Sequence, residues 1–192
     1  ALVLNLFATR SDTIILTFLR PTEEVGYYGL SRRIFDVFLV FPTFFMNATY
    51  PILLQKAQLK NQELKQIFKK SLKALIIISI FVAATLIGSA PALTIIRPEF
   101  SPAITTIRIL SLSLPIFFIT NLLMWTTIAV GKERRLGYVY GIAFLVNLIG
   151  NLTTIPRFGY NAAATVTVIT EMVVLLLLLK PIKYLTTTNE SQ

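Results

Sequence analysis

Ionisable side chains inside long apolar stretches are the residues of this sequence whose types could do chemistry. They are Arg10, Asp12, Arg32, Arg33, Asp36, Arg108 and Glu171. An embedded arginine can attract a phosphate or an acidic sugar, and an embedded carboxylate can hold a proton or a sodium ion. A charge in hydrocarbon costs about 2.5–3.5 kcal/mol on insertion scales, so each of these groups needs a partner, water or a ligand.

Other kinds of chemistry are excluded by what the sequence lacks. It contains no cysteine and no histidine, which excludes disulfide staples, Cys/His zinc or haem sites, and histidine acid–base catalysis. It also has no glycine-rich phosphate loop, no nucleophile elbow and no carboxylates arranged as a catalytic dyad. We therefore expect that the chain is not an enzyme and that it needs no cofactor and no metal centre.

The elements that must position the embedded charges are long apolar segments. The 192 residues are 55% apolar and only 14% charged, with a mean hydropathy of +0.72. A helix needs about 20 mostly apolar residues to cross the hydrocarbon layer of a membrane. Six stretches approach or reach this length: Ala1–Leu19, Tyr27–Leu54, Ala74–Ile96, Ala103–Val130, Leu136–Ile155 and Ala162–Leu179. The sequence predicts an all-α integral membrane protein with six transmembrane helices.

The basic residues are distributed unevenly over the loops that join these spans. Because successive loops lie on alternating sides, one side receives Lys56, Lys60, Lys65, Lys69, Lys70, Lys73, Lys132, Arg134, Arg135, Lys180 and Lys183. The other side receives only Arg20, Arg97 and Arg157. The positive-inside rule predicts a multi-pass protein of the cell membrane, with the loops after the second, fourth and sixth helices in the cytoplasm. The net charge of +9 then indicates membrane lipids as a partner and argues against nucleic acid.

The lysine-rich segment after the second span is expected to form an amphipathic helix from Asn61 to Lys73. Its lysines surround one apolar face that is made by Leu64, Ile67, Phe68 and Leu72. The helix is either a hinge between two groups of spans or a plain surface connection. The expected divisions are two transmembrane helices over 1–54, a cytoplasmic connector over 55–73, four transmembrane helices over 74–182 and a cytoplasmic tail over 183–192.

Two interpretations of Arg32, Arg33 and Arg108 stay open. Arg32 and Arg33 stand four and three residues before Asp36, so an ion pair is available within one helix. Either the arginines neutralise Asp36 and extend to the outer interface, or they line an outward-opening cationic cavity for an anionic or sugar-bearing ligand. Arg108 lies at a similar depth, about 8–10 Å from the outer end of its span, and has the same alternatives.

Arg10, Asp12 and Glu171 lie deeper in their spans. Arg10 and Asp12 point in different directions on a helix, so each is expected to have a partner on another helix or to face water. Glu171 is either protonated against a neighbour such as Asn147, or it titrates and couples transport to a proton or sodium ion, for which Asp12 is a second candidate. Asn147 and Asn151, four residues apart, predict hydrogen bonds between helices.

Pro42 and Pro115 fall in the middle of the second and fourth spans. Proline removes a backbone hydrogen bond and bends a helix, and such breaks often line the substrate path of a transporter. Kinked helices whose only role is packing are also common in membranes. Pro42 and Pro115 are therefore candidate hinges.

Several local patterns occur together in an order that is similar to a known family. The early ones are Arg10-Ser-Asp12-Thr-Ile-Ile-Leu16, Glu24-Val25-Gly26-Tyr27-Tyr28, Leu30-Ser-Arg32-Arg33-Ile34 and Tyr50-Pro51-Ile52-Leu53. The late ones are Ile155-Pro156-Arg157-Phe158-Gly159-Tyr160-Asn161-Ala162-Ala163-Ala164-Thr165 and Ile169-Thr170-Glu171. Over essentially its whole length, the chain resembles the second half of Wzx-type polysaccharide flippases, also called polysaccharide biosynthesis proteins. These belong to the multidrug/oligosaccharidyl-lipid/polysaccharide exporter superfamily.

The resemblance implies the C-terminal lobe of a two-lobe, MATE-like transporter with twelve or more helices around a central cavity. Arg10 and Asp12 match the family's arginine–aspartate motif, and Gly26 and Tyr28 match the turn after it. The motif that enters the last helix is matched by Gly159, Ala162 and Ala163. Because the family's cavity is typically cationic, the implied substrate-binding residues are Arg10, Asp12, Arg32, Arg33 and Arg108.

The implied function is to flip or export lipid-linked oligosaccharide or polysaccharide precursors, such as O-antigen units, by alternating access. Arginines would attract the diphosphate while the lipid tail stays in the bilayer. The implied partners are a missing N-terminal lobe, a polysaccharide polymerase and glycosyltransferases. A missing N-terminal lobe is expected because residue 1 is an alanine inside a span. Two alternatives stay open: a cation-coupled multidrug exporter of the same superfamily, or a non-transporting membrane subunit.

Overall fold

The computed structural model describes residues 2–58 and 62–187, and the side chains of residues 11–57, 63–95 and 97–179. Within these residues every regular element is a helix. The elements are α1 (Leu2–Leu19), α2 (Thr22–Phe38), α3 (Val40–Gln58), α4 (Gln62–Ser89), α5 (Ala92–Ile96), the 3₁₀-helix η1 (Pro98–Phe100), α6 (Ala103–Ala129), α7 (Arg134–Phe158) and α8 (Tyr160–Thr187).

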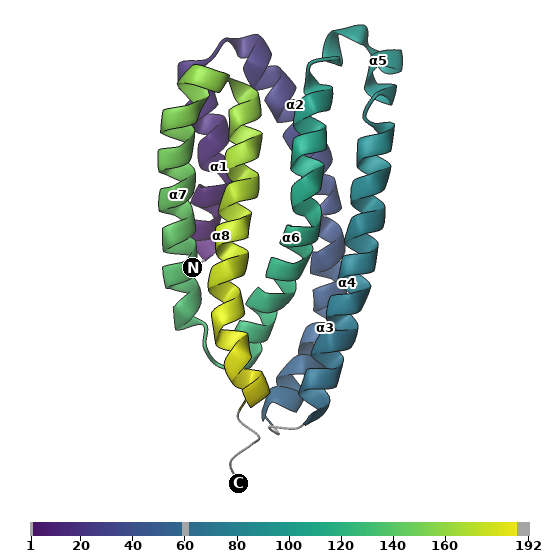
Figure 1. Ribbon diagram of the computed structural model, residues 1–192, viewed down its shortest axis with the longest axis vertical. Helices are drawn as coiled ribbons and strands as arrows, with labels where there is room; N and C mark the ends of the chain where they lie inside the picture. Colours follow the sequence, from purple (N-terminus) through teal and green to yellow (C-terminus); the bar gives the residue numbers. More distant parts are fainter. Residues whose placement is uncertain (1, 59–61, 188–192) are drawn as a thin grey trace.

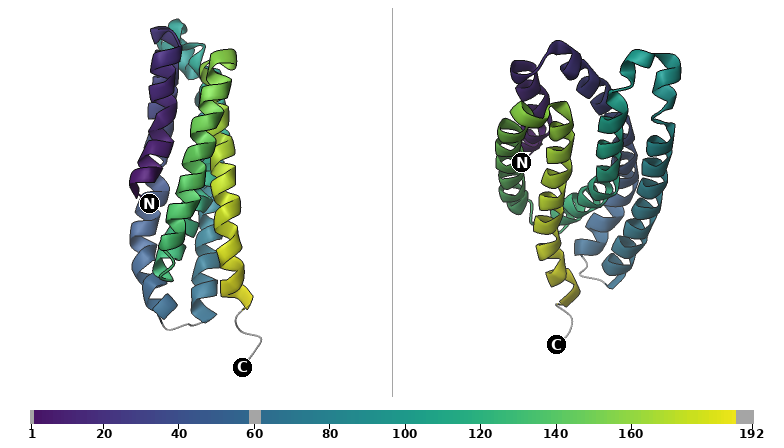
Figure 2. Two further views of the ribbon diagram at one scale, coloured as in Figure 1. Left: turned by 90° about the vertical axis from the view of Figure 1, so that its left-hand side faces the viewer. Right: turned by 45° about the horizontal axis from the view of Figure 1, so that its top comes forward.

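The long helices form an elongated bundle whose members run roughly along one axis (Figures 1 and 2). Helix α6 lies at its centre and contacts α2, α3, α4 and α8, while α1 packs against α7, and α7 against α8. Apolar side chains from these helices fill the interior, and the largest fully buried ones include Tyr28, Phe35, Phe118, Leu16 and Met46. The packing therefore brings α1 and α2 together with α7 and α8, which are about a hundred residues or more away along the chain.

Five helical stretches of the described residues are long and apolar enough to cross a membrane. They are Thr22–Ala57, Glu63–Ile95, Ala103–Ala129, Arg134–Phe158 and Tyr160–Leu179, and each overlaps one of the last five predicted spans. The first predicted span corresponds to α1, which packs alongside them, although residue 1 lies outside the described residues. The all-α membrane fold expected from hydropathy is therefore what the structure has.

The ends of the bundle separate the basic residues into the two expected groups. The turn between α1 and α2, the short elements α5 and η1, and the turn between α7 and α8 lie at the upper end of Figure 1. The end of α3 and the start of α4 lie at the lower end, with the connection from α6 to α7. Arg20, Arg97 and Arg157 belong to the first set of segments, and the described basic residues of the lysine-rich loops belong to the second. Which end lies in the cytoplasm stays a prediction.

The second predicted span is broken at Leu39 into α2 and α3. Leu39 donates its backbone N–H to the carbonyl of Asp36 at 3.2 Å, which is the tighter i to i+3 pattern of a turn. Pro42, three residues later, has no N–H for the carbonyl of Phe38, and its ring crowds that carbonyl. Proline therefore breaks the helix on its N-terminal side, at Leu39, and not at Pro42 itself.

Pro115 has a milder effect, because α6 stays continuous from Ala103 to Ala129 around it. Pro115 lies near the middle of α6, and Figure 1 shows that the lower half of this helix slants toward α8. Both prolines thus mark places where a span changes direction. Their role as hinges stays a prediction.

The amphipathic segment is not a separate helix, because residues 62–73 continue without a break into the third span as one helix, α4. No glycine or proline stands at the expected boundary after Lys73, so nothing interrupts the backbone hydrogen bonds. The expected apolar face exists, since the residues that pack against the core are Leu64, Ile67, Phe68 and Leu72. Helix α4 instead ends at Ser89, before Pro91, and α5 follows as a separate turn of helix.

Close packing of α7 on α8 at Gly150 gives a first prediction. A Cβ at this position would lie 2.9 Å from Cγ1 of Val166, a buried and β-branched side chain with little freedom to move. We expect Gly150→Ala to lower the free energy of unfolding by about 1–3 kcal/mol through overpacking. Gly141→Ala, in the same helix with nothing within 4 Å, should raise it by about 0.5–1 kcal/mol. Denaturant titration in mild detergent measures both, and equal effects would contradict the predicted contact.

Candidate functional site

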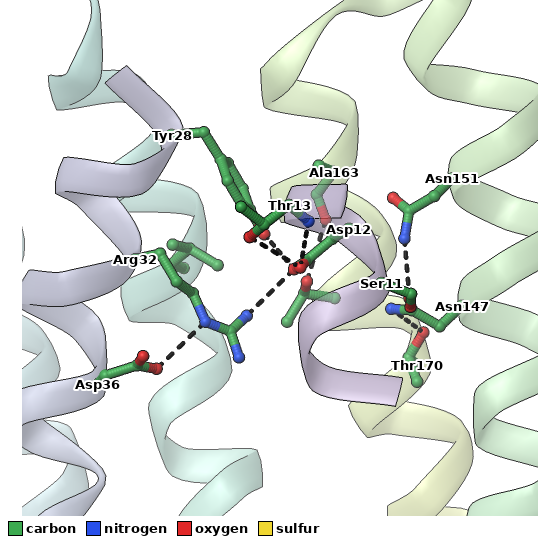
Figure 3. A network of polar contacts seen from close by, with 12 residues as sticks. Ser11, Asp12, Thr13, Tyr28, Arg32, Asp36, Asn147, Asn151, Ala163 and Thr170 are labelled. Carbon is green, nitrogen blue, oxygen red and sulfur yellow. Dashed lines mark hydrogen bonds and ion pairs between the residues drawn. The ribbon is translucent and has the colours of Figure 1, made fainter. Parts of the chain in front are cut away.

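Asp12 is the centre of a buried polar network between α1 and α2 (Figure 3). Its side chain is 1% exposed. One carboxylate oxygen accepts the backbone N–H of Thr13 at 2.6 Å, and the other accepts the hydroxyl of Tyr28 and Nη1 of Arg32, the latter at 3.3 Å. A carboxylate can be buried at this depth because charged and neutral donors surround it. The expectation that Asp12 has a partner on another helix is confirmed.

Arg32 joins two carboxylates. Its side chain is 4% exposed, and besides Asp12 it binds Asp36 through Nε at 3.1 Å, one turn further along α2. The local pair predicted from the four-residue spacing of Arg32 and Asp36 is therefore present. The second pair, to Asp12 on α1, makes Arg32 a bridge between two spans.

A second group of polar side chains starts at the neighbouring residue, Ser11. Its hydroxyl donates to Oδ1 of Asn147 at 2.8 Å, and the same oxygen accepts Nδ2 of Asn151 at 2.8 Å. Nδ2 of Asn147 reaches the hydroxyl of Thr170 at 3.5 Å. Residues 11 and 12 point about 100° apart on the helix, so α1 binds α2 through Asp12 and α7 through Ser11. The hydrogen bonding between helices predicted from sequence is confirmed for Asn147, whereas Asn151 bonds to Asn147 within α7.

Glu171 lies elsewhere in the interior, between α8 and α6. Its side chain is buried, and Oε2 lies 3.1 Å from the hydroxyl of Thr120. That hydroxyl also lies 3.1 Å from the carbonyl of Phe117, and its single proton can serve only one of the two. The neighbour suggested from sequence, Asn147, is therefore wrong, because the asparagine is engaged with Ser11 and Asn151.

Two of the predicted arginines, Arg33 and Arg108, are not brought to this network. Arg33 and Arg108 are both exposed. On α6, Ala103 and Phe117 contact Ser31 and Phe35 of α2, and Arg108 lies about 140° around the helix from Ala103. Arg33 lies about 200° around α2 from Ser31, so the two arginines are exposed on opposite outer faces. The side chain of Arg10 lies outside the described residues.

Sequence reasoning missed the site roles of Tyr28, Ser11 and Thr120. Tyr28 was visible only as part of a turn motif, although a tyrosine one turn before Arg32 must share its helix face. Ser11 and Thr120 carry no individual signal, since hydroxyls in membrane helices commonly bond to their own backbone. Only the packing of α1 on α7 and of α6 on α8 reveals these contacts.

The arrangement offers charges and hydrogen bonds without the geometry of a reaction centre. Across the side chains that the structure describes, no group of three or more His, Cys, Asp or Glu residues could hold a metal ion. The network of Asp12, Arg32 and Asp36 can bind an anion through the arginine or a cation through a carboxylate. Either event would break contacts between α1 and α2, so binding at this site would be linked to the packing of two spans.

Comparisons with known proteins agree with such a membrane-spanning fold. The sequence model of the MatE family matches residues 1–153. The "Probable flippase AglR" of Haloferax volcanii is 27% identical over 164 residues, which cover 82% of this chain and 34% of the relative. The solved structure named "Lipid II flippase MurJ, inward closed conformation" has a TM-score of 0.78 at 17% identity, covering 94% of this chain and 40% of that one.

This chain therefore spans about a third of the length of one relative and two fifths of the other. The likeness to MurJ shows the fold, an all-α membrane bundle. The MatE family and both matched proteins are transporters and not enzymes, which confirms that this chain is no enzyme. Because the family match extends over most of the sequence, the chain belongs to the MatE family.

Proposed function

We propose that this chain forms one lobe of a flippase that moves a lipid-linked oligosaccharide or polysaccharide precursor across the cell membrane. The observation that supports this most directly is that both similar proteins are named as flippases, one of them for lipid II. The second lobe would correspond to the part of those two proteins that this chain does not cover. A Wzx-type substrate, such as an O-antigen unit, fits a lobe that carries embedded arginines.

The outer face of α2 and α3 is the surface that we assign to the substrate path. Arg33 and Asn47 are exposed there, on the two sides of the break at Leu39, together with Val37 and Phe44. By contrast, α4 exposes Ile77 and other apolar side chains at membrane depth. An exposed arginine and asparagine inside a span fit a water-filled path better than acyl chains. Arg33 would attract the diphosphate, with Arg32 one residue away inside the lobe.

In an alternating-access cycle, the break in the second span and the bend in α6 would serve as hinges. The lipid tail would stay in the bilayer between the lobes while the sugar and diphosphate pass along the polar face. Rocking of the lobes would be absorbed near Leu39 and Pro115, where the helices already change direction. We place the lysine-rich end of the bundle in the cytoplasm, following the positive-inside rule.

Transport assays of Arg33 test this assignment, with Arg108 as a matched control on the opposite outer face. We expect Arg33→Ala, in the protein produced from its complete gene, to reduce export of the lipid-linked saccharide at least tenfold, since it removes one charged contact to the diphosphate. Thermal stability should not change, because Arg33 is exposed. Arg108→Ala should export at the rate of the unchanged protein. Equal export by both variants at equal expression would refute the path that we assign.

A cation-coupled multidrug exporter of the same superfamily is the second candidate function. The observation that favours it is the burial of Glu171 beside Thr120, with Asp12 as a second buried carboxylate. Either group could take up a proton or sodium ion during the cycle. Dye efflux that depends on sodium or pH and is lost in Glu171→Gln would support this function, and saccharide export without any ion dependence would oppose it.

A further inference from the structure

The first half of α4 carries a row of exposed lysines. Lys65, Lys69, Lys70 and Lys73 are all exposed, while the opposite face of the same turns packs against the core of the lobe. Spacings of three and four residues place Lys69, Lys70 and Lys73 on adjacent positions of one helix surface. The helix backbone thus holds the starting points of three lysine side chains close together, and their flexible stems can bring the ammonium groups to one anion.

The same surface becomes apolar directly beyond the lysines. Ile77, Ile80 and Phe81 are 58%, 56% and 73% exposed and continue the row along the unbroken helix. Such a stripe faces acyl chains, so the edge of the hydrocarbon lies close to Lys73. At 1.5 Å per residue, Lys69 lies about 6 Å beyond Lys73, and the headgroup layer on each side of a bilayer is about 5–7 Å thick. The three lysines therefore lie at the depth of lipid phosphates.

None of the carboxylates that the structure describes neutralises the positive charge of this row. Glu63, the acidic residue at the start of α4, forms its ion pair with Lys56 at the end of α3. Within the described side chains, no ion pair joins a carboxylate to Lys69, Lys70 or Lys73. Helix α4 and the end of α3 are thereby tied together while the lysine row stays available to an external anion.

We propose that Lys69, Lys70 and Lys73 form a binding site for the phosphate headgroup of an anionic phospholipid, whose acyl chains lie along Ile77, Ile80 and Phe81. A soluble phosphate would meet the lysines alone, whereas a phospholipid satisfies both the charged and the apolar part of this surface. Binding would fix the depth of α4 in the membrane and support the α3–α4 junction beside it. The site is independent of the substrate that the lobe transports.

Lipid titration of the purified protein tests the site. The protein is prepared in a neutral detergent, and bound phosphatidylglycerol is counted by native mass spectrometry, with phosphatidylcholine as the neutral comparison. We expect the triple variant Lys69→Gln/Lys70→Gln/Lys73→Gln to weaken phosphatidylglycerol binding about fivefold for each lysine, or about a hundredfold in total. The corresponding lysine-to-arginine triple variant should keep it. Because all three side chains are exposed, thermal unfolding without lipid should be unchanged in both.

A matched control removes the same charge from the same end of the bundle. Lys132, in the connection between α6 and α7, is exposed, as are Arg134 and Arg135 in the first turn of α7. Changing all three to glutamine should leave phosphatidylglycerol binding within about twofold. The proposal is overturned if this control loses as much binding as the α4 variant, since surface potential alone would then explain it. It is also overturned if phosphatidylcholine binds equally well, or if inorganic phosphate displaces the lipid at equal concentration.

Discussion

Arg32→Leu is expected to lower the free energy of unfolding by about 3–5 kcal/mol, a larger effect than any other substitution in this lobe that we describe. Arg32 is buried and holds Asp12 at 3.3 Å and Asp36 at 3.1 Å. Removing it leaves the Asp12 carboxylate buried without its cation, and an uncompensated buried charge is far more costly than a missing apolar contact. Chemical denaturation in mild detergent, followed by circular dichroism, measures the change.

Two further variants separate this cause from a general effect of losing an arginine. Arg33→Leu removes the same charge from the next residue, but Arg33 is exposed, so stability should change by less than about 0.5 kcal/mol. Adding Asp12→Asn to Arg32→Leu removes the stranded carboxylate and should restore part of the loss. If Arg33→Leu were as destabilising as Arg32→Leu, or if Asp12→Asn made the loss larger, the buried ion pair would not be what joins α1 to α2.

Arg32 and Arg33 are neighbours in the sequence, but one is buried and the other exposed, so we expect them to have different roles. The sequence could not assign them, because both fall in the same polar pattern and only helix rotation separates the inner from the outer one. In the structure, one guanidinium stabilises the lobe and the other stays exposed on the face that we assign to the substrate path. A loss of transport in Arg32 variants could therefore result from a less stable fold or from weaker substrate binding. In Arg33 variants, a loss of transport would report on substrate binding alone.

Hydropathy was sufficient to predict the fold class, since a span of about 20 apolar residues has few alternatives to a membrane helix. Hydropathy did not predict where two of the helices begin and end, because helix ends depend on which backbone hydrogen bonds are interrupted. Pro42 breaks the helix at Leu39, three residues earlier, because proline disturbs the carbonyl four residues before it. Residues 62–73 join α4 because charge and polarity, unlike glycine and proline, do not interrupt helical hydrogen bonds.

The candidate site was predictable only where partners share a helix. Arg32 and Asp36 are one turn apart, so their pair follows from spacing alone. Asp12 and Arg32 are on different helices, but they stand at similar distances from the turn at Pro21, about 14 and 17 Å along α1 and α2. That similar depth is a signal from which the second pair could have been inferred. No such signal links Thr120 with Glu171, because the order of helices around the bundle decides which spans meet.

Gly159→Ala is expected to lower the free energy of unfolding by about 2–3 kcal/mol. Gly159 joins α7 to α8 with φ 68° and ψ −157°, a conformation that is essentially restricted to glycine. A Cβ there would also lie 2.9 Å from Oε2 of Glu24 and 3.1 Å from Nη2 of Arg20. These two side chains form a paired contact in which Arg20 donates from Nε and Nη2, at 2.9 and 2.7 Å. Glu24 thereby raises the pKa of Arg20 above its ordinary value, so the guanidinium keeps its charge.

Gly131→Ala is the control that separates the two causes of this loss. Gly131 also has a positive φ, 72°, but nothing lies within 4 Å of its missing Cβ, so its replacement measures backbone strain alone, at about 1 kcal/mol. The additional loss at Gly159 should then come from the Arg20–Glu24 pair, and it should shrink when Glu24→Ala is combined with Gly159→Ala. Equal losses at Gly131 and Gly159, unchanged by Glu24→Ala, would mean that the pair can move aside at no cost. In that case Gly159 would be required only by the geometry of the turn, and the contact between the α1–α2 and α7–α8 turns would not hold this end of the bundle together.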